Sequence, residues 1–208
     1  MKRVLIFIMV MAIAIMAYSQ EMEVESVSST SGGKLSAGAK FGPVFKNLYG
    51  SDVSNNKIGT GFQFGVHGNY KFTDMISAQV EMNLEGKGAK FKAGGVTSKH
   101  RLTYFTIPFM ARGDYGLNDK MSVFANTGFF VGFLLGARVD GDKDNYKTLD
   151  FGWLIGGGFA YEVIQNLKAF ADMRINLGLV NIPDASNNNK VKTFSFVLGF
   201  GAAYTLPY

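Results

Sequence analysis

The end of the chain, from Thr193 to Tyr208, alternates between two kinds of side chain. Every second residue counted back from Tyr208 is apolar or aromatic, and the residues between them are small or weakly polar. Because successive side chains of a strand point to opposite faces, this pattern predicts a strand with one apolar face. An aromatic residue at the end of such a strand is typical of a barrel that closes against lipid.

The same alternation recurs along the chain and is clearest between Ile76 and Lys87, where apolar residues alternate with Ser, Gln, Glu and Asn. Segments rich in Gly, Asn and Asp separate these runs and indicate turns. The pattern predicts strands over residues 34–45, 58–72, 76–87, 100–115, 121–137, 149–163, 168–180 and 193–208.

The connections between these strands alternate between long and short, and the long ones include a basic loop over 88–99 and a charged loop over 138–148. Outer-membrane barrels have an even number of strands and this alternation of turns and loops. The predicted fold class is therefore all-β, an eight-stranded antiparallel up-and-down transmembrane β-barrel. Its last strand must pair with the first to remove both edges, and Pro207 predicts that this pairing ends by about Leu206.

A soluble barrel of the lipocalin type also alternates, but with its apolar face inward. The aromatic final strand, the rhythm of the connections and the aromatic residues near strand ends favour the membrane barrel. Charged residues avoid the apolar faces of most predicted strands. The residues expected to form the interfacial aromatic girdles are Phe45, Tyr49, Phe72, Phe151, Tyr161, Tyr204 and Tyr208.

The N-terminus predicts a secretory signal peptide over residues 1–19, cleaved near Ser19-Gln20. A basic start is followed by an apolar run from Val4 to Ala17 and by the small residues of a cleavage site. The alternative is a membrane-anchoring helix, but this run has 14 residues, whereas a spanning helix needs about 20. The expected domains are then a flexible periplasmic leader over 20–33 and an outer-membrane barrel over 34–208.

Composition agrees with export to the outer membrane of a Gram-negative bacterium. The chain has no cysteine and a net charge of +5, which becomes +3 when Lys2 and Arg3 are removed with the signal peptide. A charge of this size does not indicate a nucleic-acid partner.

Three strand segments carry a family resemblance. The segment Leu102–Met110 (LTYFTIPFM) is similar to the L-x-Y-x-x-I-P-L-L strand of PorT-like outer-membrane barrels of the Bacteroidota, which are often described as porin-family proteins. Asp150–Gly158 and Gly178–Ile182 resemble two further strands of that family, D-x-G-x-x-x-G-x-G and G-L-x-N-I. The resemblance implies a barrel fold from about Gly33 to Tyr208, and its motifs carry no catalytic residues.

The polar faces predict charged side chains inside the barrel. An eight-stranded barrel is just wide enough for side chains to fill its interior, so a network of both charge signs is expected to plug the lumen. The alternative is a narrow channel or a component associated with transport or secretion. The residues expected in this polar lumen network are Lys71, Glu81, Glu85, Asp172 and Arg174.

Two kinds of partner follow from the remaining features, outer-membrane lipid with its lipopolysaccharide and the barrel-insertion machinery. The basic loop is a candidate to contact lipopolysaccharide phosphates, or else it serves solubility alone. Its lysines are Lys87, Lys90, Lys92 and Lys99. By resemblance to other barrels, Tyr204 and Tyr208 are the expected assembly signal of the last strand.

We expect no enzyme activity, no cofactor and no metal. His67 falls on the polar face with no nucleophile beside it, so a lipid-modifying enzyme is the least favoured alternative. Asp140–Asn145 resembles the start of a calcium loop but lacks Gly at the sixth position, and Phe151 replaces the Glu at the twelfth. The glycines 156–158 lie within a predicted strand, where they do not form a nucleotide-binding loop.

Overall fold

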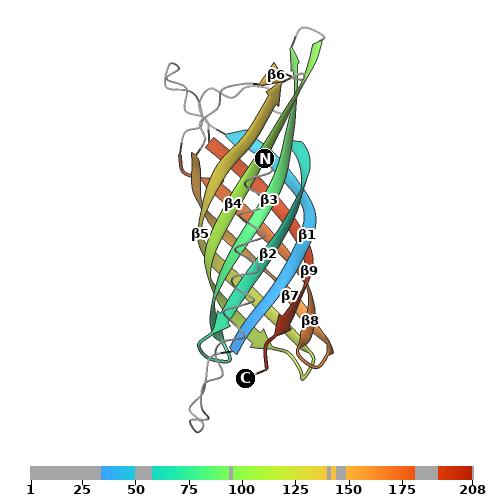
Figure 1. Ribbon diagram of the computed structural model, residues 1–208, viewed down its shortest axis with the longest axis vertical. Helices are drawn as coiled ribbons and strands as arrows, with labels where there is room; N and C mark the ends of the chain where they lie inside the picture. Colours follow the sequence, from blue (N-terminus) through green and yellow to red (C-terminus); the bar gives the residue numbers. More distant parts are fainter. Residues whose placement is uncertain are drawn as a thin grey trace. The chain divides into compact units, whose positions relative to one another are not determined.

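The computed structural model describes residues 34–49, 58–93, 96–139, 142–143, 149–180 and 192–207. These residues form one antiparallel sheet that closes on itself (Figure 1). Among them, no helix is long and apolar enough to cross a membrane. The strands are β1 (Lys34–Tyr49), β2 (Gly59–Lys71), β3 (Ile76–Ala93), β4 (Val96–Gly116), β5 (Met121–Val139), β6 (Asp142–Lys143), β7 (Leu149–Ile164), β8 (Leu167–Gly178) and β9 (Lys192–Thr205).

The closed sheet confirms the predicted barrel. Each long strand pairs antiparallel with its neighbour in the chain, and β6 is a two-residue strand that pairs only with the end of β5. The first long strand, β1, pairs with the last, β9, from Ser36 opposite Thr205 to Tyr49 opposite Lys192. Eight strands therefore form the wall, and pairing between β1 and β9 removes both edges, as predicted.

The pairing between β1 and β9, which closes the barrel, ends at Leu206, as predicted from Pro207. The N–H group of Leu206 donates the last bond of this pairing to the carbonyl of Leu35, at 2.8 Å. Two other prolines interrupt ladders inside the wall. The β1–β9 register has no pairs at Gly42 and Pro43, and the β3–β4 register has none beside Pro108. A proline lacks the N–H that a ladder requires, which accounts for both gaps.

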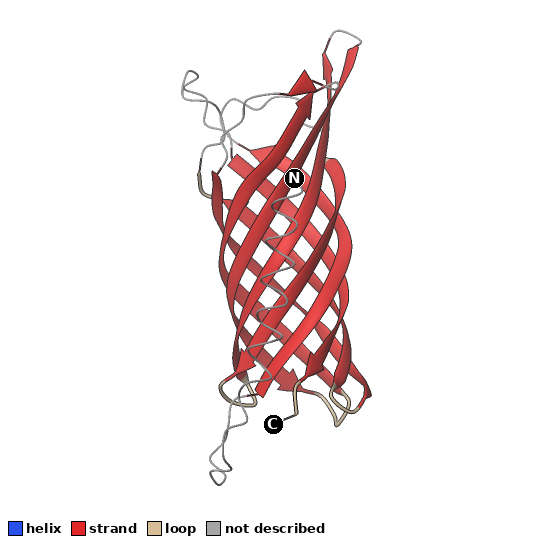
Figure 2. Ribbon diagram, viewed as in Figure 1, coloured by secondary structure: helices blue, strands red, loops and turns tan. Residues whose placement is uncertain are grey.

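The short connections 72–75, 117–120 and 165–166 gather at one end of the barrel (Figure 2). The tightest of these turns has Asn166 at a φ of 66°, a left-handed conformation that Asn tolerates better than most residues. In outer-membrane barrels, short turns face the periplasm. The end with these turns is accordingly the periplasmic end, and the opposite end faces outward.

The strands at the outward end are longer than the sequence predicts. The predicted basic loop over 88–99 is wrong, because β3 continues to Ala93 and β4 begins at Val96, which makes one long hairpin (Figure 1). Strand β1 likewise continues to Tyr49, and the predicted loop over 138–148 contains β6. Strands outside the lipid need no apolar face, so hydrophobic alternation does not mark their ends.

The two faces of the wall have opposite character. On β1, Lys40 is 1% exposed and its neighbour Phe41 is 60% exposed. Large apolar side chains are exposed on the outside all around the barrel, whereas the buried set contains many polar and charged residues. This is the reverse of a soluble protein, and it matches a barrel whose outside meets hydrocarbon.

One polar group on the lipid-facing side, the Trp153 indole N–H, is satisfied within the wall. The Trp153 indole N–H donates to the Thr127 hydroxyl at 2.7 Å, and that hydroxyl donates to the Leu154 carbonyl at 3.1 Å. Hydrocarbon offers no hydrogen-bond partner, so an indole facing lipid needs one from the protein.

Candidate functional site

The inward face of β3 is a continuous polar stripe that runs along the lumen. Strict alternation turns every second side chain of this strand inward, and each of these inward residues is almost fully buried. From the periplasmic end outward, they are Ser77, Gln79, Glu81, Asn83 and Glu85.

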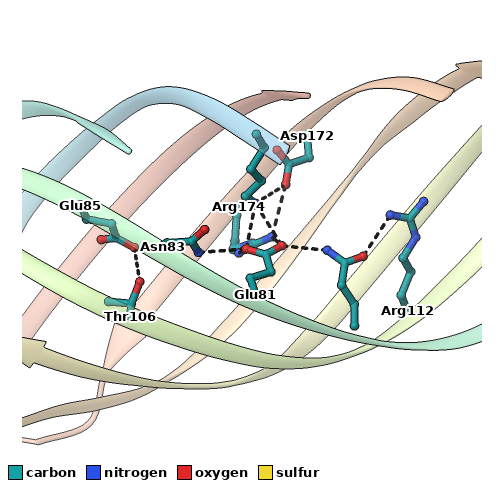
Figure 3. Close-up of polar contacts among 9 residues, drawn as sticks. Glu81, Asn83, Glu85, Thr106, Arg112, Asp172 and Arg174 are labelled. Carbon is teal, nitrogen blue, oxygen red and sulfur yellow. Dashed lines mark hydrogen bonds and ion pairs between the residues drawn. The ribbon is translucent and has the colours of Figure 1, made fainter. Parts of the chain in front are cut away.

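At the centre of this stripe, Glu81 binds two cations from other strands (Figure 3). Arg174 of β8 donates to both of its carboxylate oxygens, at 2.9 and 2.8 Å, and Lys40 of β1 lies 3.0 Å from one of them. Asp172, also on β8, accepts from Lys40 and from Arg174, each at 3.3 Å. We call Lys40, Glu81, Asp172 and Arg174 the central cluster.

The central cluster crosses the lumen. Its residues come from β1, β3 and β8, and none of these strands is a direct neighbour of another in the wall. Two cations face two carboxylates, so the charges balance. Gln79 and Asn83 also donate to Glu81, at 2.7 and 2.9 Å. Such a group is expensive to bury, but breaking it is more expensive, because a charge is then left without a partner.

Glycines on the neighbouring strands make room for these side chains. A methyl group on Gly199 of β9 would collide with the Asp172 carboxylate, and one on Gly65 of β2 would collide with the Asn83 side-chain oxygen. These two inward side chains therefore lie against bare backbone of the neighbouring strands.

Arg112 extends the polar contacts toward the periplasmic end. It donates to the Gln79 side-chain oxygen at 3.2 Å and to Asp114 at 2.8 Å, and its guanidinium lies 3.7 Å from the centre of the Phe124 ring. Since Gln79 also bonds to Glu81, hydrogen bonds connect Asp114 to the central cluster.

The outward half of the lumen is mixed in character. Thr106 donates to Glu85 at 2.9 Å, and Thr193 donates to Asp150 at 3.1 Å. Three buried apolar residues pack together on the wall formed by β4, β5 and β7. They are Met110, Phe130 and Leu154.

The structure brings together three of the five predicted lumen residues, Glu81, Asp172 and Arg174. Glu85 lies farther along the same stripe, and Lys71 lies at the periplasmic end, where it donates to the Asp74 carbonyl at 3.5 Å. Sequence analysis missed Lys40 and Arg112. Their signal was available, because each lies on the polar alternation of its strand between apolar outward residues.

The predicted lipopolysaccharide-contacting lysines occupy the long β3–β4 hairpin. Lys90 is paired with Lys99, Lys92 with Thr97 and Gly88 with Arg101. The register has the same offset as in the wall, where Leu84 is paired with Phe105. The pairing of β3 with β4 therefore continues from the wall into the hairpin that carries these lysines.

The other candidates fall in several places. Tyr204 is on the lipid-facing side of β9 and 44% exposed, and Tyr208 lies outside the described residues. His67 is buried in the lumen, with its ring 5.3 Å from that of Phe170. Of the calcium-loop candidate, only Asp142 and Lys143 are described, and they form β6. Among the described residues, no group of three or more His, Cys, Asp or Glu could hold a metal.

A closed eight-stranded wall with an apolar outside and a charged, packed inside defines a bacterial outer-membrane β-barrel. Residues 18–207 match the model of the outer membrane protein beta-barrel domain family, and the chain belongs to this family. No curated protein matches the chain.

Solved structures share the fold at low sequence identity. The outer membrane protein OprG from Pseudomonas aeruginosa is 13% identical with a TM-score of 0.61, covering 88% of this chain and 100% of its own. Neisserial surface protein A is 16% identical with a TM-score of 0.57, covering 84% and 99%. A major outer membrane protein from Thermus thermophilus is 16% identical with a TM-score of 0.53, covering 84% and 100%. At these identities the likeness concerns the fold.

Proposed function

We propose that this protein is a closed outer-membrane barrel, with no ion-conducting path and no catalytic role, that acts through its outward-facing surface. The observation that carries the proposal is the central cluster. Its ion pairs join strands from different sides of the lumen at distances of 2.8 to 3.3 Å, and its side chains are almost fully buried. An ion that passed this level would have to separate buried charges that hold each other.

Planar-bilayer recordings test the closed lumen. We expect the unaltered protein to give no reproducible conductance steps. A variant with Lys40→Ala, Glu81→Ala and Arg174→Ala removes the largest side chains of the cluster and should conduct. The matched control carries the same number of alanine substitutions on the lipid-facing side, at Phe41, Met82 and Ile175, and should stay closed. Steady, ion-selective steps from the unaltered protein would favour the alternative, a narrow channel or transport-associated component.

The outward-facing surface that we propose to act is the basic β3–β4 hairpin, with lipopolysaccharide as its partner. The support is that Lys90, Lys92, Lys99 and Arg101 come together in one hairpin at the outward end of the barrel, and basic clusters of this kind attract anionic lipid headgroups. Lys90 opposite Lys99 is a like-charge pair, which is unfavourable in a strand pair unless an anion compensates it. Anionic phosphate groups next to the wall supply that compensation.

Thermal stability with and without purified lipopolysaccharide tests this contact. In detergent micelles, added lipopolysaccharide should raise the melting temperature of the unaltered barrel, and Lys90→Gln with Lys99→Gln should lose most of that increase. Lys34→Gln with Lys120→Gln removes the same charge at the periplasmic end and serves as the control. An equal increase in all three proteins would contradict the assignment to the hairpin.

We further infer that the aromatic end of β9 is read by the barrel-insertion machinery. Tyr204 on the lipid-facing side of this strand and Tyr208 are the residues concerned. Deleting Tyr208 should reduce the amount of barrel assembled in cells but leave the unfolding midpoint of purified, inserted protein unchanged. Equal assembly of the truncated and full chains would contradict the inference, and Pro207→Ala is a control that keeps the terminal aromatic residue.

Within its family, we infer that the chain is a PorT-like barrel of the Bacteroidota type. The support is the similarity of Leu102–Met110, Asp150–Gly158 and Gly178–Ile182 to strands of those barrels. The inference concerns relationship and carries no role in secretion. The inference would fail if the gene for this chain came from a genome outside the Bacteroidota and related barrels from that genome lacked these three strand sequences.

A further inference from the structure

The periplasmic end of the lumen contains a hollow of about 310 Å³ whose lining includes four lysines. They come from different parts of the wall, namely the beginning of β1, the end of β2, the β4–β5 turn and the beginning of β8. We call this hollow the periplasmic vestibule. Its lysines are Lys34, Lys71, Lys120 and Lys168.

Cations outnumber the carboxylates available to them in the vestibule. Three aspartates also line it, Asp74, Asp114 and Asp119. Of these, Asp114 is already bound by Arg112 through contacts of 2.8 and 3.2 Å. With this pair and the Lys168–Glu162 pair, at 4.0 Å, counted as neutral, three ammonium groups face two carboxylates, and the vestibule carries an excess of one positive charge.

Two of these lysines are directly opposed. The β1–β2 register pairs Lys34 with Lys71, and like charges facing each other across a strand pair are destabilising. Lys168 and Arg112 also act on Lys71 as like charges, whereas Asp114 and Asp74 attract it. Among the described residues, neither Lys34 nor Lys120 has an ion pair, and Lys168 reaches Glu162 only at 4.0 Å. The carboxylates of the protein therefore compensate this repulsion only in part.

Arg112 lies next to the vestibule, where it is bound to the lining residue Asp114. Its bonds to Asp114 and Gln79, together with the Phe124 ring against its guanidinium, hold it between the vestibule and the central cluster. A ligand that enters from the periplasm would thus meet the lysines on the walls of the vestibule. This volume is at the small end of ligand-binding pockets.

We propose that the periplasmic vestibule binds a compact polyanion, a small ligand with two or more phosphate or carboxylate groups. Several ammonium donors converge on one small space, which suits an anion with several oxygens better than a single charge. The bound anion would relieve the repulsion between Lys34 and Lys71. The vestibule lies at the opposite end of the barrel from the hairpin, so this site is independent of the function proposed above.

Isothermal titration calorimetry of the folded full-length protein in a zwitterionic detergent at low salt tests the proposal. The two probes are tripolyphosphate and citrate. Binding of tripolyphosphate alone identifies a phosphate ligand, and binding of citrate alone identifies a carboxylate ligand. For the probe that binds, we expect Lys34→Gln with Lys71→Gln to weaken the affinity by about tenfold, because two charge-assisted contacts are lost.

Two further variants separate binding from nonspecific effects. Asp119→Asn removes a vestibule carboxylate and should tighten binding about two- to threefold, a change that a general loss of structure would not produce. Lys192→Gln removes a lysine at the outward end and should leave the affinity unchanged. Heat-modifiable gel mobility shows that each variant is folded. If neither probe binds, or if Lys192→Gln weakens binding as much as Lys34→Gln alone, the proposal is wrong.

Discussion

The inside and the outside of this barrel are built by the same strands but follow opposite rules. Lys40 and Phe41 are consecutive residues of β1, yet the lysine is buried in the central cluster and the phenylalanine faces lipid. Outside, most side chains need only be apolar, and their exact neighbours matter less, apart from the contact between Trp153 and Thr127. Inside, each charged residue of the central cluster depends on particular partners, because an unpaired charge is costly when it is buried.

This difference teaches that substitutions should act differently on the two faces. On the inside, the effect should depend on what happens to the partner. On the outside, it should depend on the polarity of the new side chain and its depth in the membrane. The predictions below separate these two expectations by reversible unfolding of the barrel in lipid vesicles.

The largest effect is expected from Glu81→Ala. Lys40 and Arg174 would then share Asp172 alone, and breaking a buried ion pair in this way costs about 3–5 kcal/mol of unfolding free energy. Adding Arg174→Met should recover part of the loss, because it removes one of the two uncompensated cations. Additive losses in the double variant would show that the two side chains do not act as a unit.

On the outside, Ile155→Arg should cost about 2–4 kcal/mol, the typical penalty of an arginine near the bilayer midplane. Ile155 is 55% exposed in the middle of β7. The control Ile155→Leu keeps the side chain apolar and should change the unfolding free energy by less than about 1.5 kcal/mol. A tolerated arginine would contradict the assignment of this face to lipid.

The same substitution, glycine to alanine, can be made on the inner and on the outer face of the wall. Gly199→Ala places a methyl group against the Asp172 carboxylate and should cost about 1–3 kcal/mol through overpacking. Gly68→Ala adds the same methyl group to the lipid-facing side of β2, where it meets nothing within 4 Å. We expect the second variant to be neutral or slightly stabilising, and equal costs would disprove the packed-lumen interpretation.

The smallest effect is expected at the polar contact on the outside. Thr127→Val removes the acceptor of the Trp153 indole N–H and should cost about 1 kcal/mol, the net value of one hydrogen bond. Trp153 is the only tryptophan of the chain, so its emission reports on this site alone. Lipids with brominated acyl chains should quench that emission in both proteins, and no quenching would place the indole away from hydrocarbon.

Much of the wall was predictable from the sequence, because alternation is a local property. The strand period is two, so the face of a residue follows from its neighbours alone. Strand number, the closing pair and the end of pairing near Pro207 followed from the same reasoning. The hairpin did not, since Lys90 and Lys99 carry no apolar alternation that could have marked the continuation of β3 and β4.

By itself, the sequence therefore determined which side chains turn inward and which meet lipid. Only the closed structure decided which inward side chains meet one another. Lys40 finds Glu81 across 41 residues of sequence and Asp172 across 132, and Lys71, on the same polar alternation, lies too far along the axis to join them. The alternation along a strand specifies the face on which a residue lies. Its depth along the barrel axis and the side chains that it contacts depend on how the strands tilt and close around the lumen.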